Sequence, residues 1–400
     1  MSGAALPVTT AIPIAAAVAA AVAAAAILLL KRDPASVLRD VRFAITGRRG
    51  RRTTSSPAKG ARWASNAWDG RVVWVVGASQ GLGYVVAYEL ARRGARLILS
   101  SRNRAKLETV RSGLPNPNNH VVVPVDVTDE PSVQSAVRAV RHALSDDGAL
   151  NTGYGGVACV ALCVGRSQRA PAEETEVDVD RAAMEVNFHG PVAVAKHALG
   201  LLKESPPGAS PAGGHERGRF LVLCSLAGTV PSPAQASYCA AKHALRAWFE
   251  TLRAELHPKH DGVGVTVCCP GPAGGAPRSV FGATLRPAAD GDDDGDMRGN
   301  APAGAPDAAT LPEGITQEGS VSSQDGKAEK RLDPLWVAQV CVDATEAGAH
   351  EALLAPSPLL GFALLYRFVP FVANAALRLK GPKRVAACRS GKSLYEGLTN

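Results

Sequence analysis

The sequence predicts an α/β fold: a single domain built on a doubly wound parallel sheet, with a membrane anchor at its N-terminal end. Short runs of apolar, β-branched residues alternate with helical patterns, beginning with residues 71–76 and the helix expected at 84–93. The glycine-rich turn between these two, residues 77–83, would let backbone N–H groups approach a pyrophosphate. A second strand follows at residues 96–99. This order of elements is typical of a Rossmann-like sheet.

The remaining elements continue this alternation. Further strands are expected at residues 121–125, 157–165, 219–224, 263–269 and 351–355, and helices at 131–144, 181–202, 234–256 and 333–347. Residues 203–218 are rich in Pro, Gly and Ser and predict a surface loop. Residues 282–331 are dominated by Gly, Pro, Ala, Asp and Ser, which indicates a disordered, low-complexity insertion.

Composition excludes some classes of function. The 400 residues are 46% hydrophobic, which is enough for a substantial core. The net charge of +8 is modest, and much of it lies in residues 48–52 without interleaved aromatic residues, so we expect no nucleic-acid partner. The eight cysteines show no spacing typical of a zinc site or a disulfide framework. We expect no metal and interpret the cysteines as small buried hydrophobic residues.

The N-terminal residues predict attachment to a membrane. Residues 5–30 carry no charge and are long enough for one span, so residues 1–32 are interpreted as a transmembrane or signal anchor. A cleaved signal peptide and an Ala-rich tail are the alternatives, and the lack of a basic residue before Lys31 argues against the former. Residues 33–68 form a basic juxtamembrane linker. The positive-inside rule then places the rest of the chain in the cytosol, and we expect the endoplasmic reticulum membrane.

A second apolar stretch lies near the other end of the chain. Residues 358–379 are apolar and aromatic, are interrupted by Arg367 and Pro370, and are short for a membrane span. Residues 358–400 are therefore interpreted as a hydrophobic flap and tail. The flap would lie either on the membrane surface or on the face of the domain.

One pair of residues indicates acid–base chemistry. Tyr238 and Lys242 are four residues apart in a predicted helix, so their side chains lie on the same face. A nearby ammonium favours the phenolate and lowers the pKa of a tyrosine toward neutrality, which makes the phenol a usable proton donor. Such pairs also occur by chance, with a solvated Lys over a half-buried ring. The pair therefore indicates catalysis only if other residues of a catalytic site accompany it in the sequence.

Those further residues resemble the short-chain dehydrogenase/reductase family. The spacing of Gly77, Gly81 and Gly83 is similar to the family's G-x-x-x-G-x-G fingerprint. Ser225 precedes Tyr238 by the family's thirteen residues, and Asn187 matches its helical Asn. The resemblance implies that Ser225, Tyr238, Lys242 and Asn187 are catalytic. Ser225 would bond the substrate oxygen, and Asn187 would hold a water that links Lys242 to solvent.

The resemblance also implies where a nicotinamide cofactor binds. The implied contacts are Gly77, Ser79, Gln80, Gly81, Leu82, Gly83, Asp126, Val127, Gly165, Tyr238, Lys242, Pro270 and Gly271. An acidic residue after the second strand would select NAD, but Arg102 stands there and suits the 2′-phosphate of NADP(H). The chain departs from the family at residues 162–165, which keep only the Gly of Asn-Asn-Ala-Gly, and it lacks the Thr that often follows Pro270 and Gly271.

The resemblance covers residues 69–379, and we assign residues 69–357 to the catalytic domain, with residues 282–331 where the family keeps its substrate lid. It is strongest to membrane-associated members that use NADP(H) and act on lipophilic carbonyls such as steroids and retinoids. The sequence therefore predicts a membrane-bound NADP(H)-dependent oxidoreductase that interconverts a lipophilic carbonyl and an alcohol. The family allows a homodimer. The alternatives are a 3-ketosphinganine-type reductase and a catalytically degenerate, NADPH-binding membrane scaffold.

Overall fold

The computed structural model describes residues 66–145, 148–150, 156–256, 262–274, 280–281, 320–321, 329–356 and 359–390. The predicted anchor, nearly all of the linker and most of the low-complexity insertion lie outside these ranges. In the described residues, no helix is both long and apolar enough to cross a membrane.

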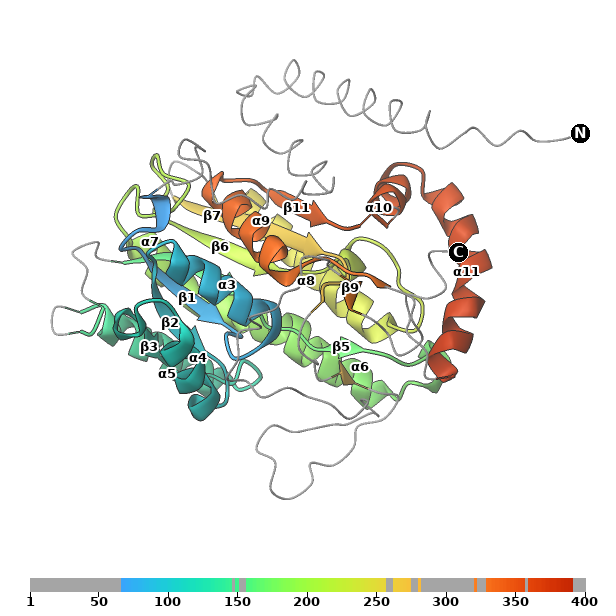
Figure 1. Ribbon diagram of the computed structural model, residues 1–400, viewed down its shortest axis with the longest axis horizontal. Helices are drawn as coiled ribbons and strands as arrows, with labels where there is room; N and C mark the ends of the chain where they lie inside the picture. Colours follow the sequence, from blue (N-terminus) through green and yellow to red (C-terminus); the bar gives the residue numbers. More distant parts are fainter. Residues whose placement is uncertain are drawn as a thin grey trace, which may run out of the picture.

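Seven parallel strands form the central sheet (Figure 1), in the order β11-β7-β6-β4-β1-β2-β3. The strands are β1 (Val72–Val76), β2 (Arg96–Ser100), β3 (Val121–Val122), β4 (Val157–Leu162), β6 (Gly218–Leu223), β7 (Val263–Pro270) and β11 (Glu351–Leu354). The chain moves outward in one direction from β1 to β3 and in the other from β4 to β11, so the order reverses between β1 and β4. Ligands of such sheets bind beyond the carboxyl ends of the strands at that reversal. The predicted doubly wound sheet is confirmed.

Helices cover both faces of the sheet. The helices α5 (Glu130–Ala143), α7 (Gly190–Glu204) and α8 (Ala236–Glu255) pack on one face, in a core cluster that includes Trp74, Phe220 and Phe249. The helices α3 (Gly81–Arg92), α4 (Arg104–Gly113) and α9 (Pro334–Glu346) pack on the other face, in a second cluster around Val73 and Leu97. Alternate residues of β1 face opposite clusters, as the pleat of a strand requires.

Two elements differ from the sequence prediction. The strand expected at 121–125 is regular only at Val121 and Val122, although the N–H groups of Val123 and Val125 still donate to the carbonyls of Leu99 and Ser101. The single helix expected at 181–202 is three segments: α6 (Val177–Met184), the π-helical turn η4 (Glu185–His189) and α7. The short elements are η1 (Asn66–Trp68), η2 (Pro117–Asn119), η3 (Ala172–Glu174), η5 (Leu226–Gly228), β5 (Ser167–Gln168), β8 (Val280–Phe281), β9 (Ser320–Val321) and β10 (Glu329–Lys330).

The C-terminal flap is a pair of helices, α10 (Leu359–Phe368) and α11 (Pro370–Arg389), at the end of the molecule away from α4 and α5 (Figure 1). The helix α10 packs on the domain face, where its buried Ala363 joins Leu226 and Val230. The helix α11 leaves Phe371 and Leu379 about three-quarters exposed.

The cysteines behave largely as the sequence predicts. All eight are free thiols, and six of them are buried. Within the described ranges, no group of His, Cys, Asp and Glu side chains is arranged to hold a metal ion.

Candidate active site

The glycine turn after β1 is too tight for side chains at two of its positions. Gly77 has φ +91°, and a Cβ atom there would lie 2.9 Å from the backbone of Cys163 and Val164. A Cβ on Gly83 would lie 2.0 Å from the Gly77 carbonyl oxygen. The turn therefore presents bare backbone at the start of α3, which is a suitable cradle for a pyrophosphate.

The other predicted residues of the turn differ in what they can offer. Gln80 is exposed and Ser79 is half-buried, so both side chains are accessible. Gly81 has φ +57° and begins α3. The Leu82 side chain is buried in the core, so this residue can offer a ligand only its backbone.

Two arginines lie near the turn, one of which the sequence analysis missed. Arg102 follows β2 and is exposed. Arg166 follows β4 and is half-buried, and its pKa is lowered by burial and, to a smaller degree, by the positive charge of Arg102. Because β1 lies between β2 and β4, the two guanidinium groups follow the strands on either side of the glycine-turn strand. An anion between them would relieve their repulsion. The sequence alone does not indicate that Arg166 could bind an anion, because a single Arg after Gly165 belongs to no recognisable motif.

Asp126 and Val127 follow β3, which lies beyond β2 at the edge of the sheet. The Asp126 carboxylate accepts hydrogen bonds from the backbone N–H of Thr128 at 2.9 Å and from its hydroxyl at 2.7 Å. Val127 packs so closely against Gly190, at the start of α7, that a Cβ there would lie 2.6 Å from Val127 Cγ2. These contacts fix the loop at the carboxyl edge of the sheet, where the sequence places it.

Tyr238 and Lys242 meet as predicted, in the first two turns of α8. Lys242 Nζ lies 5.9 Å from the centre of the half-buried Tyr238 ring. The Lys242 side chain is only 1% exposed and donates hydrogen bonds to the carbonyls of Leu223 at 3.2 Å and Val164 at 3.3 Å. It therefore ties α8 to the carboxyl ends of both β6 and β4. A buried cation held in this way is a fixed positive charge beside the phenol.

Ser225 lies two residues after the end of β6 and is half-buried. Its Oγ accepts a hydrogen bond from the Ala227 N–H at 3.2 Å, which starts the short helix η5. Ser225 and Lys242 both adjoin the end of β6, because Lys242 donates to Leu223 two residues before the serine.

Asn187 explains the π-helical turn. Its fully buried side chain donates to the carbonyl of Ala183, four residues earlier, at 2.9 Å. It also exchanges two hydrogen bonds of 2.9 Å with the backbone N–H and carbonyl of Arg166. Single π turns of this kind occur frequently at functional sites.

Gly165 lies between the two buried polar side chains. A Cβ there would be 3.2 Å from both Asn187 Oδ1 and Lys242 Nζ. The structure thus brings Asn187, Gly165 and Lys242 together at the end of β4.

Comparisons with known proteins bear on the family of this chain. The family model for short chain dehydrogenase matches residues 71–278, which is more than half of the chain. The chain belongs to the short-chain dehydrogenase/reductase family. Human dehydrogenase/reductase SDR family member 7 is 35% identical over 224 residues, which cover 52% of this chain and 59% of that protein. Rat dehydrogenase/reductase SDR family member 7B is 31% identical over 207 residues, covering 50% and 57%. The chain thus spans about three-fifths of the length of these relatives.

A solved structure shows the same fold. The crystal structure of a short chain dehydrogenase from Burkholderia cenocepacia, in complex with NADP, superposes with a TM-score of 0.52 at 20% identity. The match covers 77% of this chain and 98% of that one.

Relative to the family, the end of β4 is altered. Cys163 stands at one of the usual Asn positions, and burial raises the pKa of its thiol strongly, so the side chain remains a neutral thiol. Its backbone N–H still donates to the Val76 carbonyl at 2.8 Å, and the Val164 carbonyl still accepts from Lys242. Backbone groups therefore hold this loop in place without the amide side chains.

The last two predicted cofactor contacts, Pro270 and Gly271, lie at the end of β7. Pro270 ends that strand, and the Gly271 N–H donates to the carbonyl of Leu354 at the end of β11. Leu332 and Pro272 are also bonded through their backbones, at 2.8 Å. The turn is thus held from the neighbouring strand and from the segment before α9.

Proposed function

We propose that this chain is an NADP(H)-dependent oxidoreductase that interconverts a lipophilic carbonyl compound and its alcohol. The observation that carries the proposal is Tyr238 beside the buried Lys242, at the same sheet edge as the glycine turn. A dinucleotide fits this edge because the turn is bare backbone at the start of a helix.

Each residue of the constellation has a role in the proposal. When bound, NADP(H) supplies the hydride chemistry. Ser225 orients the substrate oxygen, and Tyr238 donates a proton to that oxygen as negative charge develops on it. Lys242 favours the deprotonated phenol and contacts the nicotinamide ribose. Asn187 holds the loop of Gly165 and Arg166 and connects Lys242 to a proton relay.

The preference for NADP(H) is supported by Arg102 and Arg166. Guanidinium groups bind phosphates through several directed N–H donors, and two of them follow the strands on either side of β1. The glycine turn lies directly after β1. A 2′-phosphate on the ribose of a dinucleotide bound there would therefore reach Arg102 and Arg166.

A lipophilic substrate is supported by the apolar contacts beside Ser225. Leu226 and Val230 follow the serine and pack against the C-terminal helix α10, with Leu360 and Phe362 at the same cluster. Leu226 and Val230 are buried, so substrate carbon atoms that approach Ser225 from this side would meet the partly exposed Leu360 and Phe362. A steroid, a retinoid or a long-chain keto-lipid has that chemistry.

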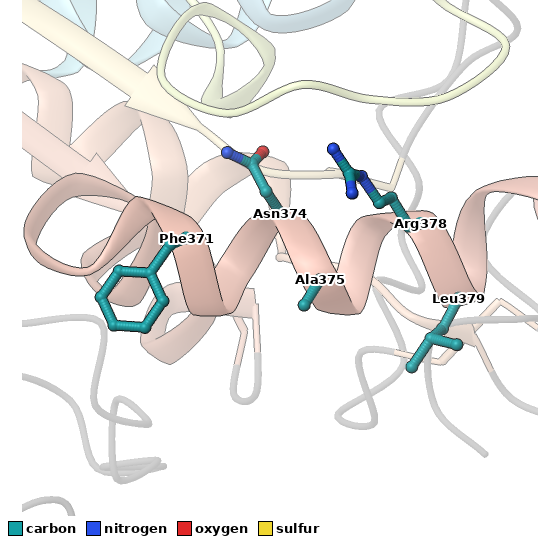
Figure 2. Close-up of a pocket in the computed structure, with 5 residues that line it drawn as sticks. All are labelled: Phe371, Asn374, Ala375, Arg378 and Leu379. Atoms are coloured by element: carbon teal, nitrogen blue, oxygen red, sulfur yellow. The ribbon is translucent and has the colours of Figure 1, made fainter.

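Attachment to a membrane is supported by the apolar sequence of residues 1–32 and by α11. We expect the endoplasmic reticulum membrane, with the domain on its cytosolic side. Figure 2 shows five residues of α11 that line a pocket. The apolar side chains of Phe371, Ala375 and Leu379 point to one side of the helix, and the polar side chains of Asn374 and Arg378 point to the other side. Phe371 and Leu379 are 75% and 76% exposed. An apolar stripe beside basic residues suits the surface of an anionic bilayer.

The rival proposal is a membrane scaffold that binds NADPH without turnover, which the altered end of β4 favours. The test is NADPH oxidation by detergent-solubilised protein with steroid, retinal and keto-sphingoid carbonyls, with NADH as the comparison cofactor. We expect turnover on one lipid class that is abolished in Tyr238→Phe, because the phenol is the proton donor. Tight NADPH binding without turnover on any class would favour the scaffold.

A further inference from the structure

Arg384 is a buried arginine on a helix that is mostly exposed. It lies near the end of α11, and only 6% of its surface is accessible. Its neighbour Lys383 is exposed. Burying a guanidinium costs free energy unless directed hydrogen bonds hold it, so the contacts that Arg384 makes are informative.

The contact of Arg384 joins the C-terminal helix to the segment before α8. Its Nη2 donates to Gln235 Oε1 at 3.0 Å, across 149 positions of the chain. The same Gln235 oxygen accepts from the Ser232 hydroxyl at 2.8 Å, and Gln235 Nε2 donates to Ser167 Oγ at 2.8 Å. The Gln235 side chain is therefore the centre of a network that links α11, the segment before α8 and the strand β5.

Gln235 also controls where α8 begins. It is the residue before the first turn of the helix, and its carbonyl accepts the N–H of Cys239 at 2.9 Å. Tyr238 lies three residues further along, in that first turn. A displacement of Gln235 would therefore move the phenol relative to Ser225 and Lys242.

The segment before α8 has a backbone conformation that needs support. Ala234 has φ +62°, a left-handed conformation that is unfavourable for a residue with a Cβ atom. Such conformations persist only where the surroundings hold them, and they cluster at functional sites. The Ala170 N–H donates to the Ala234 carbonyl at 3.2 Å, and the Gln235 network supplies the next set of contacts.

The end of α11 makes one more contact with this side of the domain. Arg389 pairs with Glu173 and Glu174 of η3, but these side chains are exposed, and exposed ion pairs contribute little. The hydrogen bond of Arg384 is therefore a buried polar contact through which α11 reaches the Gln235 side chain.

We propose that Arg384 is a positioning residue for the reaction: through Gln235, the C-terminal helix sets the start of α8 and hence the position of Tyr238. This inference rests on the proposed function. It makes the C-terminal helix a part of the catalytic unit.

The test compares Arg384→Met with Lys383→Met in the full chain in detergent. The first variant removes the buried donor and keeps an unbranched stem, and the second removes an adjacent exposed charge. We expect kcat of Arg384→Met to fall about tenfold to a hundredfold, as misplacement of a reacting group by up to about 1 Å does. The Kd of NADPH should change less than about twofold, because the hydrogen bonds of the Gln235 side chain go to Ser232, Ser167 and Arg384 and not to the glycine turn. Lys383→Met should match the wild type.

A double-mutant cycle separates positioning from general destabilisation. If Arg384 acts through Gln235, then Arg384→Met should cost nothing further in a Gln235→Met background. Additive losses would overturn the proposal, as would a wild-type kcat in Arg384→Met or an equal loss in Lys383→Met. If Arg384→Met does not fold, Arg384→Lys provides the same comparison, because it keeps the charge and one donor, and its kcat should lie between those of the wild type and Gln235→Met.

Hydrogen exchange provides a readout that does not depend on turnover. The amides of residues 235–239 should exchange faster in Arg384→Met than in Lys383→Met, and equal exchange would overturn the proposal. A failure of the proposed function would instead show as a wild-type protein that binds NADPH and turns over no carbonyl.

Discussion

Substituting Ala for Gly83 tests the claim that the turn after β1 binds the cofactor through bare backbone. The added Cβ would lie 2.0 Å from the carbonyl oxygen of Gly77, whereas real Cβ atoms are essentially never closer than 3.0 Å to such an atom. The obstacle is backbone, not the end of a flexible side chain. The turn and the start of α3 must therefore separate by about 1 Å.

The size of the effect follows from that displacement. A shift of about 1 Å is enough to break at least one charge-assisted hydrogen bond from a turn N–H to the pyrophosphate, which contributes about 1.5–3 kcal/mol. The Kd of NADPH should therefore rise about tenfold to a hundredfold. Overpacking at this site should also lower the free energy of unfolding by about 1–3 kcal/mol.

The assay is NADPH binding by fluorescence titration together with thermal unfolding, and Gly113→Ala is the matched control. Gly113 ends α4 in an exposed position, and a Cβ there meets nothing within 4 Å. The control should bind NADPH with unchanged affinity and be equally stable or slightly more stable, since Ala is the better helix former. Wild-type affinity in Gly83→Ala would refute the backbone-cradle reasoning.

Three further predictions concern stability, cofactor choice and membrane contact. Burial lowers the pKa of His120, whose Nδ1 accepts from the Leu97 N–H at 3.1 Å, so the unfolded chain binds the extra proton first as the pH falls below about 6.5. The free energy of unfolding should therefore fall between pH 7 and 5 more steeply than in His120→Gln, and parallel pH profiles would contradict this. Arg102→Asp should lower the preference for NADPH over NADH about tenfold or more, measured as the ratio of kcat/KM values, and an unchanged ratio would refute the phosphate assignment. In anionic bilayers, Phe371→Trp should gain fluorescence that brominated lipids quench. Asn374→Trp, at an exposed position that points the other way in Figure 2, should gain fluorescence that they leave unchanged. Equal quenching would remove α11 from the membrane face.

Much of the fold was predictable because it depends on local patterns. The runs that form β1, β2 and β7 are largely buried, so they are mostly apolar and stand out in the sequence. The glycines between β1 and α3 are required by contacts within the turn itself. Tyr238 and Lys242 meet because the period of one helix brings them together.

The features that were missed depend on contacts between distant segments. The π turn at Asn187 arises because its side chain bonds the Arg166 backbone, which belongs to another element. Arg166 itself has no pattern that separates it from a surface arginine. Arg384 reads as one more basic residue of an amphipathic tail, and its hydrogen bond with Gln235 joins segments 149 positions apart.

The central claim is that the phenol of Tyr238, set beside Lys242, is the proton donor of a carbonyl reduction. The most direct test measures equilibrium NADPH binding and single-turnover NADPH oxidation on the same preparations of wild type and Tyr238→Phe, with the lipid carbonyl that the wild type turns over. The account predicts equal NADPH affinity in both proteins and a rate of hydride transfer at least about a hundredfold lower in the variant. A Tyr238→Phe protein that oxidises NADPH at the wild-type rate would contradict it.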